Sequence, residues 1–320
     1  MAPSANLAPI VMFVYNRPEH TRMTIESLLE NDLATLSNLF IYADGPRNSE
    51  DREQVDRVRT YLKTINGFLS VSIIEREHNY GLAKSVITGV TEVIDKFGKA
   101  IVVEDDLVSS KDFLSFMNKA LGCYEGDERI FSVTGYSYPF AVPEGYKHRV
   151  YLSYRCCSWG WGTWRDRWTR VDWEVKDVHA FLKDREAQRR LNRGGRDLTG
   201  MLLDQMRGEI DSWAIRWCYA HSKNEAYCLY PVESKIKNIG FDRSGTHCGF
   251  SEKKYYSEIG EGLDEIECPI DIDIDESLVQ ELNKLFVPTI KQSVASALKK
   301  NKSGEHIVRI YKKLRAYVAR

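Results

Sequence analysis

The first hundred residues alternate between short apolar runs and helical stretches, and this alternation constrains the fold more than any other feature of the sequence. The apolar runs predict buried strands at residues 9–15, 39–45, 69–75 and 99–104. The stretches between and after them predict helices at 18–30, 48–65, 80–98 and 111–124. Continuous apolar strands that alternate with helices are typical of a parallel sheet covered on both faces, so we expect an α/β fold.

Polar residues follow three of these strands directly. Asn16 and Arg17 follow the first, Asp44 follows the second, and Glu104, Asp105 and Asp106 end the fourth. In open parallel sheets the ligand crevice lies at the carboxyl ends of the strands. We therefore expect these side chains to share one site.

The three adjacent carboxylates at 104–106 are the most unusual of these residues. Three neighbouring negative charges repel, and burying them is costly unless a positive charge compensates. Mg²⁺ or Mn²⁺, shared between carboxylates and substrate phosphates, would remove that repulsion. The alternative is a solvated acidic turn, and the position at a strand end favours the metal.

Two other strand-end residues have open alternatives. Asp44 lies in an Asp-Gly-Pro sequence, which is ordinary turn chemistry, or it accepts a hydrogen bond from a base or ribose. Arg17 is either a surface residue or a phosphate ligand.

The pattern changes after about residue 149. We expect a strand at 149–155, a loop at 156–163 and helices at 176–192 and 197–222. On the last helix Glu209 and Asp211 would point about 200° apart, so at most one of them faces a common site. A glycine-rich loop is expected at 237–252.

All seven tryptophans lie between Trp159 and Trp217. They form either a hydrophobic core or an aromatic face for a sugar ring, with interleaved glycines that let backbone approach a ligand.

The overall composition is that of an ordinary globular protein. The chain has 320 residues, 43% hydrophobic and 28% charged, with a net charge of −1, which gives no electrostatic reason to expect a nucleic-acid partner. Its seven cysteines show no CxxC pair and no zinc spacing, so we expect reduced cysteines and a cytoplasmic protein. No apolar run approaches the length of a membrane span.

Taken together, several segments resemble the metal-dependent glycosyltransferases of the GT-A fold. The resemblance runs from about residue 9 to residue 250 and is closest to the N-acetylglucosaminyltransferase I type and to bacterial family-two-like sugar transferases. Its most specific element is IVVEDDL followed by DF, which is similar to the family's acidic metal motif. The segments PIVMFVYNRPEHTR, SWGW, IDSW and PVESKIKNIGFDRSG resemble other parts of the family's site.

The resemblance implies a role for each candidate residue. Asp106 would bind the metal, Mn²⁺ or Mg²⁺, and Asp211 would be the catalytic base. The residues implied at the nucleotide and donor are Asn16, Arg17, Asp44, Lys84, Glu104, Asp105 and Ser234. Those implied at the donor and acceptor loop are Trp159, Trp161, Gly162 and Trp213.

The implied activity is inverting transfer of a sugar from a nucleotide-diphosphate donor, expected to be UDP-linked, to a glycan or lipid-linked saccharide. N-acetylglucosamine is one candidate sugar, although REHNYGLAKS is more similar to general family-two enzymes. The expected setting is bacterial surface polysaccharide synthesis. Residues 1–148 would bind nucleotide sugar and metal, and residues 149–290 would bind the acceptor and supply the base.

Two further points stay open at this stage. The basic tail at 291–320 carries an apolar stripe and either packs on its own domain or lies on an anionic membrane surface. Two other functions are possible. The first is a sugar nucleotidyltransferase, but such enzymes usually have a glycine-rich loop after the first strand, and VYNRPEHTR contains no glycine. The second is a non-catalytic carbohydrate-binding protein. Turnover of a nucleotide sugar would separate the last from an enzyme.

Overall fold

The computed structural model describes residues 7–242, 255–260 and 268–287. Its strands are β1 (Ile10–Val14), β2 (Asn38–Ala43), β3 (Ser70–Glu75), β4 (Lys99–Glu104), β5 (Leu107–Ser109), β6 (Ile130–Thr134), β7 (Val150–Ser153), β8 (Trp161–Trp164), β9 (Tyr227–Pro231) and β10 (Ile236–Asn238).

The α-helices are α1 (Pro18–Leu29), α2 (Ser49–Leu62), α3 (Leu82–Phe97), α4 (Phe113–Cys123), α5 (Arg165–Trp168), α6 (Val178–Phe181), α7 (Arg185–Leu191), α8 (Leu198–Met206), α9 (Trp213–Lys223) and α11 (Glu276–Lys284). Two 3₁₀ helices, η1 and η2, cover Ala34–Leu36 and Asn192–Gly194.

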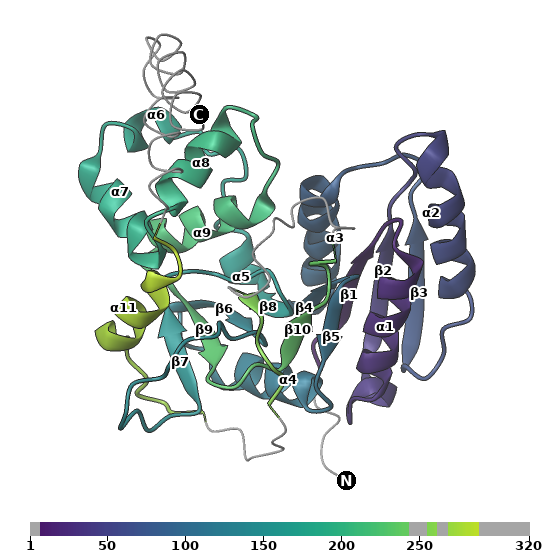
Figure 1. Cartoon of the computed structure of the whole chain (residues 1–320), viewed down its shortest axis with the longest axis horizontal. Coiled ribbons are helices and arrows are strands. Elements are labelled where there is room, and N and C mark those ends of the chain that lie inside the picture. The colour runs from purple at the N-terminus through teal and green to yellow at the C-terminus, as the bar shows by residue number, and fades with distance from the viewer. Residues whose placement is uncertain (1–6, 243–254, 261–267, 288–320) are drawn as a thin grey trace, which may run out of the picture.

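One mixed sheet of eight strands runs through the molecule in the order β3-β2-β1-β4-β8-β6-β9-β7 (Figure 1). The strands β3, β2, β1 and β4 are mutually parallel, whereas β8 is antiparallel to both β4 and β6, and β7 is antiparallel to β9. A second, two-stranded sheet pairs β5 with β10. The mixed, mostly parallel α/β architecture is therefore confirmed, and it is consistent with a GT-A fold.

The strand order reverses between β1 and β4. The chain runs from β1 outward through β2 to β3 and then returns past β1 to form β4. Because such crossovers are right-handed, α1 and α2 cover one face of the sheet and α3 covers the other. A crevice for ligands is expected outside the carboxyl ends of β1 and β4.

The sequence predicted the first four strands and their helices, each within a few residues. It was wrong about residues 156–163, because Trp161–Trp164 form strand β8 between β4 and β6. The predicted helices at 176–192 and 197–222 are each interrupted, the second by a connector at 207–212. Most of the predicted 237–252 loop and the whole tail at 291–320 lie outside the described residues.

Tryptophan rings form much of the core beyond β4. The rings of Trp161 and Trp213 stack with centroids 4.8 Å apart, and Trp168 lies 5.6 Å from Trp161 and 5.4 Å from Trp217. These contacts join β8 to α5 and α9. Aromatic pairs add to the free energy gained from area burial, so they fix α9 firmly over the sheet.

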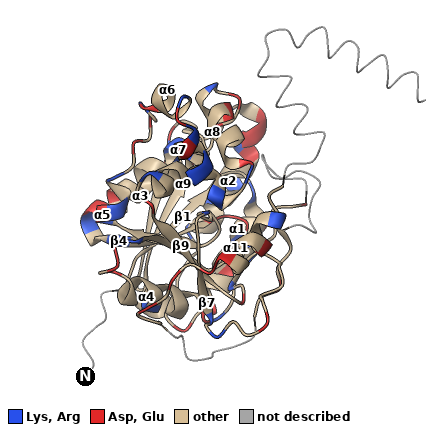
Figure 2. Ribbon diagram, turned by 90° about the vertical axis from the view of Figure 1, so that its left-hand side faces the viewer, with Lys and Arg blue, Asp and Glu red and all other residues tan. Residues whose placement is uncertain are grey.

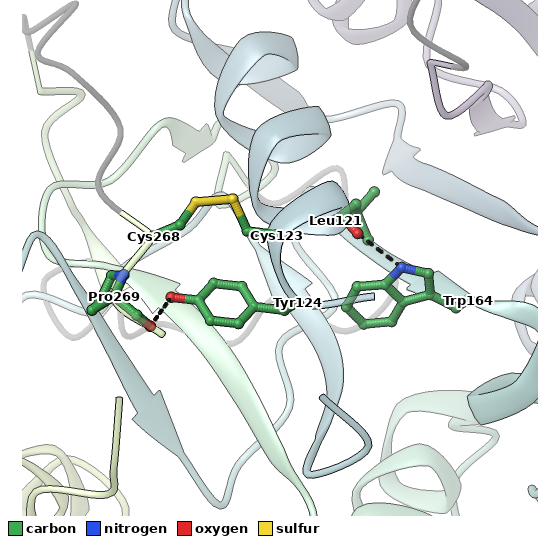
Figure 3. The surroundings of a disulfide bond; sticks show 6 residues. All are labelled: Leu121, Cys123, Tyr124, Trp164, Cys268 and Pro269. Carbon is green, nitrogen blue, oxygen red and sulfur yellow. Dashed lines mark hydrogen bonds between the residues drawn. A yellow bond between two sulfur atoms is a disulfide. The ribbon is translucent and has the colours of Figure 1, made fainter. Parts of the chain in front are cut away.

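A disulfide joins Cys123, at the end of α4, to Cys268 (Figure 3). Beside it the Tyr124 hydroxyl donates to the Pro269 carbonyl at 3.1 Å, and Trp164 Nε1 donates to the Leu121 carbonyl at 3.0 Å. The prediction that all cysteines are reduced is wrong for this pair. Sequence spacing gave no sign of it, because the two residues are 145 positions apart.

Basic and acidic residues are interspersed along helices α5 and α7 (Figure 2). This mixing agrees with the net charge of −1. Of the helices in the described part of the chain, none is both long and apolar enough to cross a membrane.

His221 is a fully buried titratable group in the core, on α9. One of its ring nitrogens lies 2.9 Å from the Ser132 hydroxyl on β6, and the other lies 2.9 Å from the Trp217 carbonyl. Burial lowers the pKa of His221 from 6.5 to about 4. Between these two values the unfolded chain binds a proton that the folded chain does not, so stability rises with pH across this range.

We therefore expect acid to weaken the fold through His221. As pH falls from 6.5 towards 4, the free energy of unfolding should lose up to about 3 kcal/mol from this group. Chemical denaturation at several pH values measures this loss, and His221→Gln should have a shallower pH dependence over the same range. Equal slopes in the two proteins would contradict the assignment.

Candidate active site

The site begins where β1 and β4 end side by side. These strands pair in parallel with Phe13 opposite Glu104, so the residues that follow them emerge together. Arg17 Nη2 donates to Asp105 Oδ1 and, at 3.0 Å, to Asp106 Oδ2. The structure thus brings Arg17 and the acidic triplet together.

A cavity of about 570 Å³ opens at this junction. Most of the sequence-predicted residues line it: Asn16, Arg17, Asp44, Glu104, Asp105, Asp106, Trp159, Asp211 and Trp213. One wall comes from the strand ends of the parallel sheet, and the other comes from the segment after β7 and from α8 and α9.

The triplet carries more negative charge than its protein partner neutralises. Burial and repulsion from Asp106 and Asp105 raise the pKa of Glu104 to about 8. Burial also raises the pKa of Asp105 to about 6, although Arg17 acts in the opposite direction. One guanidinium faces three carboxyls, so the cavity favours a further cation.

Two atoms at this point are buried and unpaired. Asp106 Oδ1 and Arg17 Nη1 have no hydrogen-bond partner among the described residues. A buried polar atom without a partner is costly, and such atoms mark sites where a ligand completes the bonding. Asp106 Oδ1 suits a hard cation, and Arg17 Nη1 suits an anionic oxygen.

These residues fit a divalent metal that takes further ligands from its substrate. Within the described ranges, no three His, Cys, Asp or Glu side chains are grouped so that they hold a metal by themselves. Mg²⁺ is commonly bound through one or two carboxylates together with substrate phosphates. Asp106 would supply the carboxylate in this arrangement.

Neighbouring segments hold the backbone of the triplet. The Thr24 hydroxyl of α1 donates to the Asp105 carbonyl at 2.9 Å, and the Ile239 amide donates to the Asp106 carbonyl at 2.8 Å. Gly240 follows directly, and a Cβ atom there would collide with the Asp106 carboxylate and lie 3.1 Å from Arg17 Nη1. The segment after β10 therefore packs on the carboxylate and guanidinium groups.

Asp44 lines the cavity, but both of its carboxylate oxygens accept backbone hydrogen bonds. The Tyr80 amide donates to Oδ1 at 2.8 Å and the Gly81 amide donates to Oδ2 at 3.1 Å. These bonds hold the turn that begins α3. A contact from Asp44 to a base or ribose stays a prediction.

A polar rim surrounds the end of β1. The Asp51 carboxylate of α2 accepts hydrogen bonds from the Tyr15 hydroxyl at 2.7 Å and from the side-chain amide of Asn16 at 3.0 Å. Arg47 lies over the Tyr15 ring and donates to Asn79 Oδ1 at 3.3 Å. Sequence analysis did not identify Tyr15, Arg47 or Asn79. Asn79 comes four residues after the end of β3, so the expectation that ligands bind at the carboxyl ends of parallel strands could have included it.

The opposite wall is largely aromatic. The Trp159 ring centroid lies 5.8 Å from those of Phe241 and Tyr255. The Phe241 and Tyr255 rings stack on each other, 5.9 Å apart and with 7° between their planes. Trp213, from the first turn of α9, also lines the cavity. Sequence analysis identified the tryptophans but not Phe241 or Tyr255.

Four predicted residues do not line the cavity. Trp161 is fully buried in β8, and a Cβ at its neighbour Gly162 would lie 2.9 Å from the Ala100 carbonyl, so packing on β4 explains that glycine. The Ser234 hydroxyl accepts from the Ser137 amide at 3.0 Å and donates to the Ile236 carbonyl at 2.7 Å. Lys84 is exposed on α3, with Nζ 4.3 Å from the centre of the Tyr80 ring.

Asp211 lies at the cavity in the connector before α9, not on a helix. α8 ends at Met206, and Gly208 has a φ of +70°, so the expected angle of 200° between Glu209 and Asp211 does not apply. The Asp211 side chain is 66% exposed and lies 3.6 Å from Arg216 Nη2. Glu209 instead pairs with Arg207 at 2.8 Å.

Sequence analysis gave no signal for Arg155, a mostly buried arginine on the far wall. Arg155 lines the cavity and forms a two-pronged ion pair with Asp197, with N–O distances of 2.9 and 3.0 Å. Its guanidinium also lies 3.8 Å from the centre of the Phe286 ring. The partners come from distant segments, which no local pattern connects.

Comparisons with known proteins give little further guidance. No family model and no curated protein matches the chain. Among solved structures, the mannosyltransferase PcManGT from Pyrobaculum calidifontis in complex with GDP-Man and Mn²⁺ is 12% identical with a TM-score of 0.38, over 70% of this chain and 71% of that chain. S. aureus TarS is 15% identical with a TM-score of 0.30, over 42% of this chain and 23% of that chain. At these values neither similarity carries an argument about function.

The packing of Gly240 gives a prediction about the site. A methyl group there meets the ends of two flexible side chains, so Gly240→Ala should displace the Asp106 carboxylate and Arg17 without unfolding the chain. We expect weaker binding of Mn²⁺, by about tenfold or more, and a melting temperature close to that of the wild type. Gly122→Ala, where a Cβ meets nothing within 4 Å, is the matched control. Unchanged Mn²⁺ binding in Gly240→Ala would contradict this account.

Proposed function

We propose that this protein is a metal-dependent glycosyltransferase of the GT-A type. It transfers a sugar from a nucleotide-diphosphate donor, UDP-linked in our proposal, to a hydroxyl of a saccharide or lipid-linked saccharide. The observation that carries the proposal is the pair of buried, unpaired atoms at the β1–β4 junction, Arg17 Nη1 and Asp106 Oδ1. Together they offer a donor to a phosphate oxygen and a ligand to a cation.

The donor occupies the wall formed by the strand ends. Arg17 binds a diphosphate oxygen, and Tyr15, Asn16, Arg47 and Asn79 surround the nucleoside. Their geometry supports this placement, because Asp51 fixes Tyr15 and Asn16 and the chain places both beside Arg17.

Asp106 would hold a divalent cation, Mn²⁺ or Mg²⁺, and this cation would supply the positive charge that stabilises a diphosphate leaving group. Asp105 keeps Arg17 in position through their ion pair. Glu104 lines the cavity beside these residues and would orient the donor sugar or a metal-bound water.

The acceptor lies against the aromatic wall. Trp159, Trp213, Phe241 and Tyr255 offer ring faces that suit the apolar face of a sugar. Asp211, at the edge of this wall, takes the proton from the attacking hydroxyl. Direct displacement with a base on the acceptor side gives inversion at the anomeric carbon.

Nucleotide sugars and Mn²⁺ test the proposal together. We expect at least one nucleotide sugar to raise the melting temperature, with stabilisation near 3 kcal/mol at a hundredfold excess over Kd, and chelation to remove the effect. Asp106→Asn should lose the metal-dependent part, whereas Asp273→Asn, a surface carboxylate paired with Arg129, should not. If no nucleotide sugar binds, with or without metal, the proposed function is wrong.

Asp211 and Glu209 give a matched pair for the base. Asp211→Asn keeps the size and shape of the side chain but cannot accept the proton, so turnover should fall by about 10²–10⁴-fold while donor binding is retained. Glu209→Gln should cost much less, because Glu209 pairs with Arg207 outside the cavity. Steady-state release of the nucleoside diphosphate measures both variants. Normal turnover by Asp211→Asn would remove Asp211 as the base.

A further inference from the structure

Two cysteines meet on the wall of the cavity. Cys156, in the segment after β7, and Cys218, on α9, are 62 residues apart in the chain, and their sulfur atoms lie 2.6 Å apart. Both line the cavity, and their exposed fractions are 5% and 4%. A disulfide bond is about 2.05 Å long, so little movement separates the two thiols from a covalent bond.

The two thiols have unequal chemistry. The side-chain hydrogen bond between the two sulfur atoms and the positive charge of nearby Arg155 lower the pKa of Cys218. Burial raises the pKa of Cys156. A thiolate is the reactive form of cysteine, so Cys218 is the nucleophile of the pair and Cys156 is the thiol that resolves it.

The other two described free thiols lack this arrangement. Cys157 and Cys228 are buried, and burial raises the pKa of both. The Cys228 thiol donates to the Leu229 carbonyl at 3.8 Å, and Cys157 accepts from the Trp159 amide at 3.4 Å. They serve as internal controls for a reaction at Cys218.

We propose that Cys156 and Cys218 form a reversible redox site on the cavity wall, with hydrogen peroxide as the oxidant. The Cys218 thiolate attacks one peroxide oxygen, the O–O bond breaks, and the products are a sulfenic acid and hydroxide, which takes up a proton to become water. The Cys156 sulfur then attacks the Cys218 sulfur and loses its proton, and the hydroxyl leaves as a second water. Two thiols are oxidised to one disulfide, and one peroxide is reduced to two waters.

The bond would join two parts of the aromatic wall. It ties the segment that carries Trp159 to the helix that begins with Trp213, next to Asp211. The disulfide would then join the segment after β7 to α9 covalently, on the cavity wall opposite Arg17. This inference rests on the sulfur geometry and does not depend on which substrate the cavity binds.

Peptide mapping of the full chain tests the site without any variant. After treatment with peroxide and alkylation of the remaining thiols, non-reducing digestion should give a linked peptide that contains Cys156 and Cys218. The protein should lose two titratable thiols, and dithiothreitol should restore both. If Cys156 and Cys218 stay separately alkylated, or Cys218 is oxidised without linkage to Cys156, the proposal is wrong.

Matched variants give a second measurement. Cys218→Ser should prevent the loss of the two thiols, whereas Cys228→Ser should leave it unchanged. A failed linkage with normal nucleotide-sugar binding would overturn the redox site alone, and linkage without nucleotide-sugar binding would overturn the proposed function alone.

Discussion

The pairing of Arg17 with Asp105 and Asp106 is the interaction on which the rest of the site depends. It exists because β1 and β4 are parallel neighbours, so an arginine that follows one strand meets carboxylates that follow the other. Burial makes the triplet costly, and the guanidinium compensates only part of its charge. The fold therefore keeps two buried polar atoms without partners at a cost in stability, Asp106 Oδ1 and Arg17 Nη1. A bound cation would pair with the first, and a bound diphosphate would pair with the second.

Sequence alone predicted the parallel half well, because β1, β2 and β4 each contain a continuous apolar run bounded by a turn or a helix. It failed at β8, where Trp161 and Gly162 fit neither helical nor strand patterns. Their strand conformation comes from pairing with β4 and from a close approach to the Ala100 carbonyl. It failed again at 207–212, where a helical pattern continues but Gly208 takes a left-handed conformation and ends it.

The same division holds within the site. Arg17, Asp44 and the acidic triplet could be predicted because the rule that places them is local: each follows the end of a parallel strand. Pairs such as Arg155–Asp197, Cys156–Cys218 and Cys123–Cys268 could not, because each joins distant segments and no periodicity connects them. Ser234 differs from both groups, because its segment resembles a binding motif while its hydroxyl bonds to backbone groups in this structure.

The two walls of the cavity differ in how the chain holds them, and this difference bears on the proposed reaction. Hydrogen bonds from Thr24 and Ile239 to the Asp105 and Asp106 carbonyls fix the backbone of the charged wall. The opposite wall depends on α9, which stacked tryptophans hold to the sheet, while Asp211 lies exposed in the connector before it. In the proposed reaction, the position of Asp211 relative to the donor would therefore be set by how α9 and its connector pack. A covalent link from Cys218 to the segment of Trp159 would act on that same packing, on the wall opposite the charged groups proposed to bind the donor.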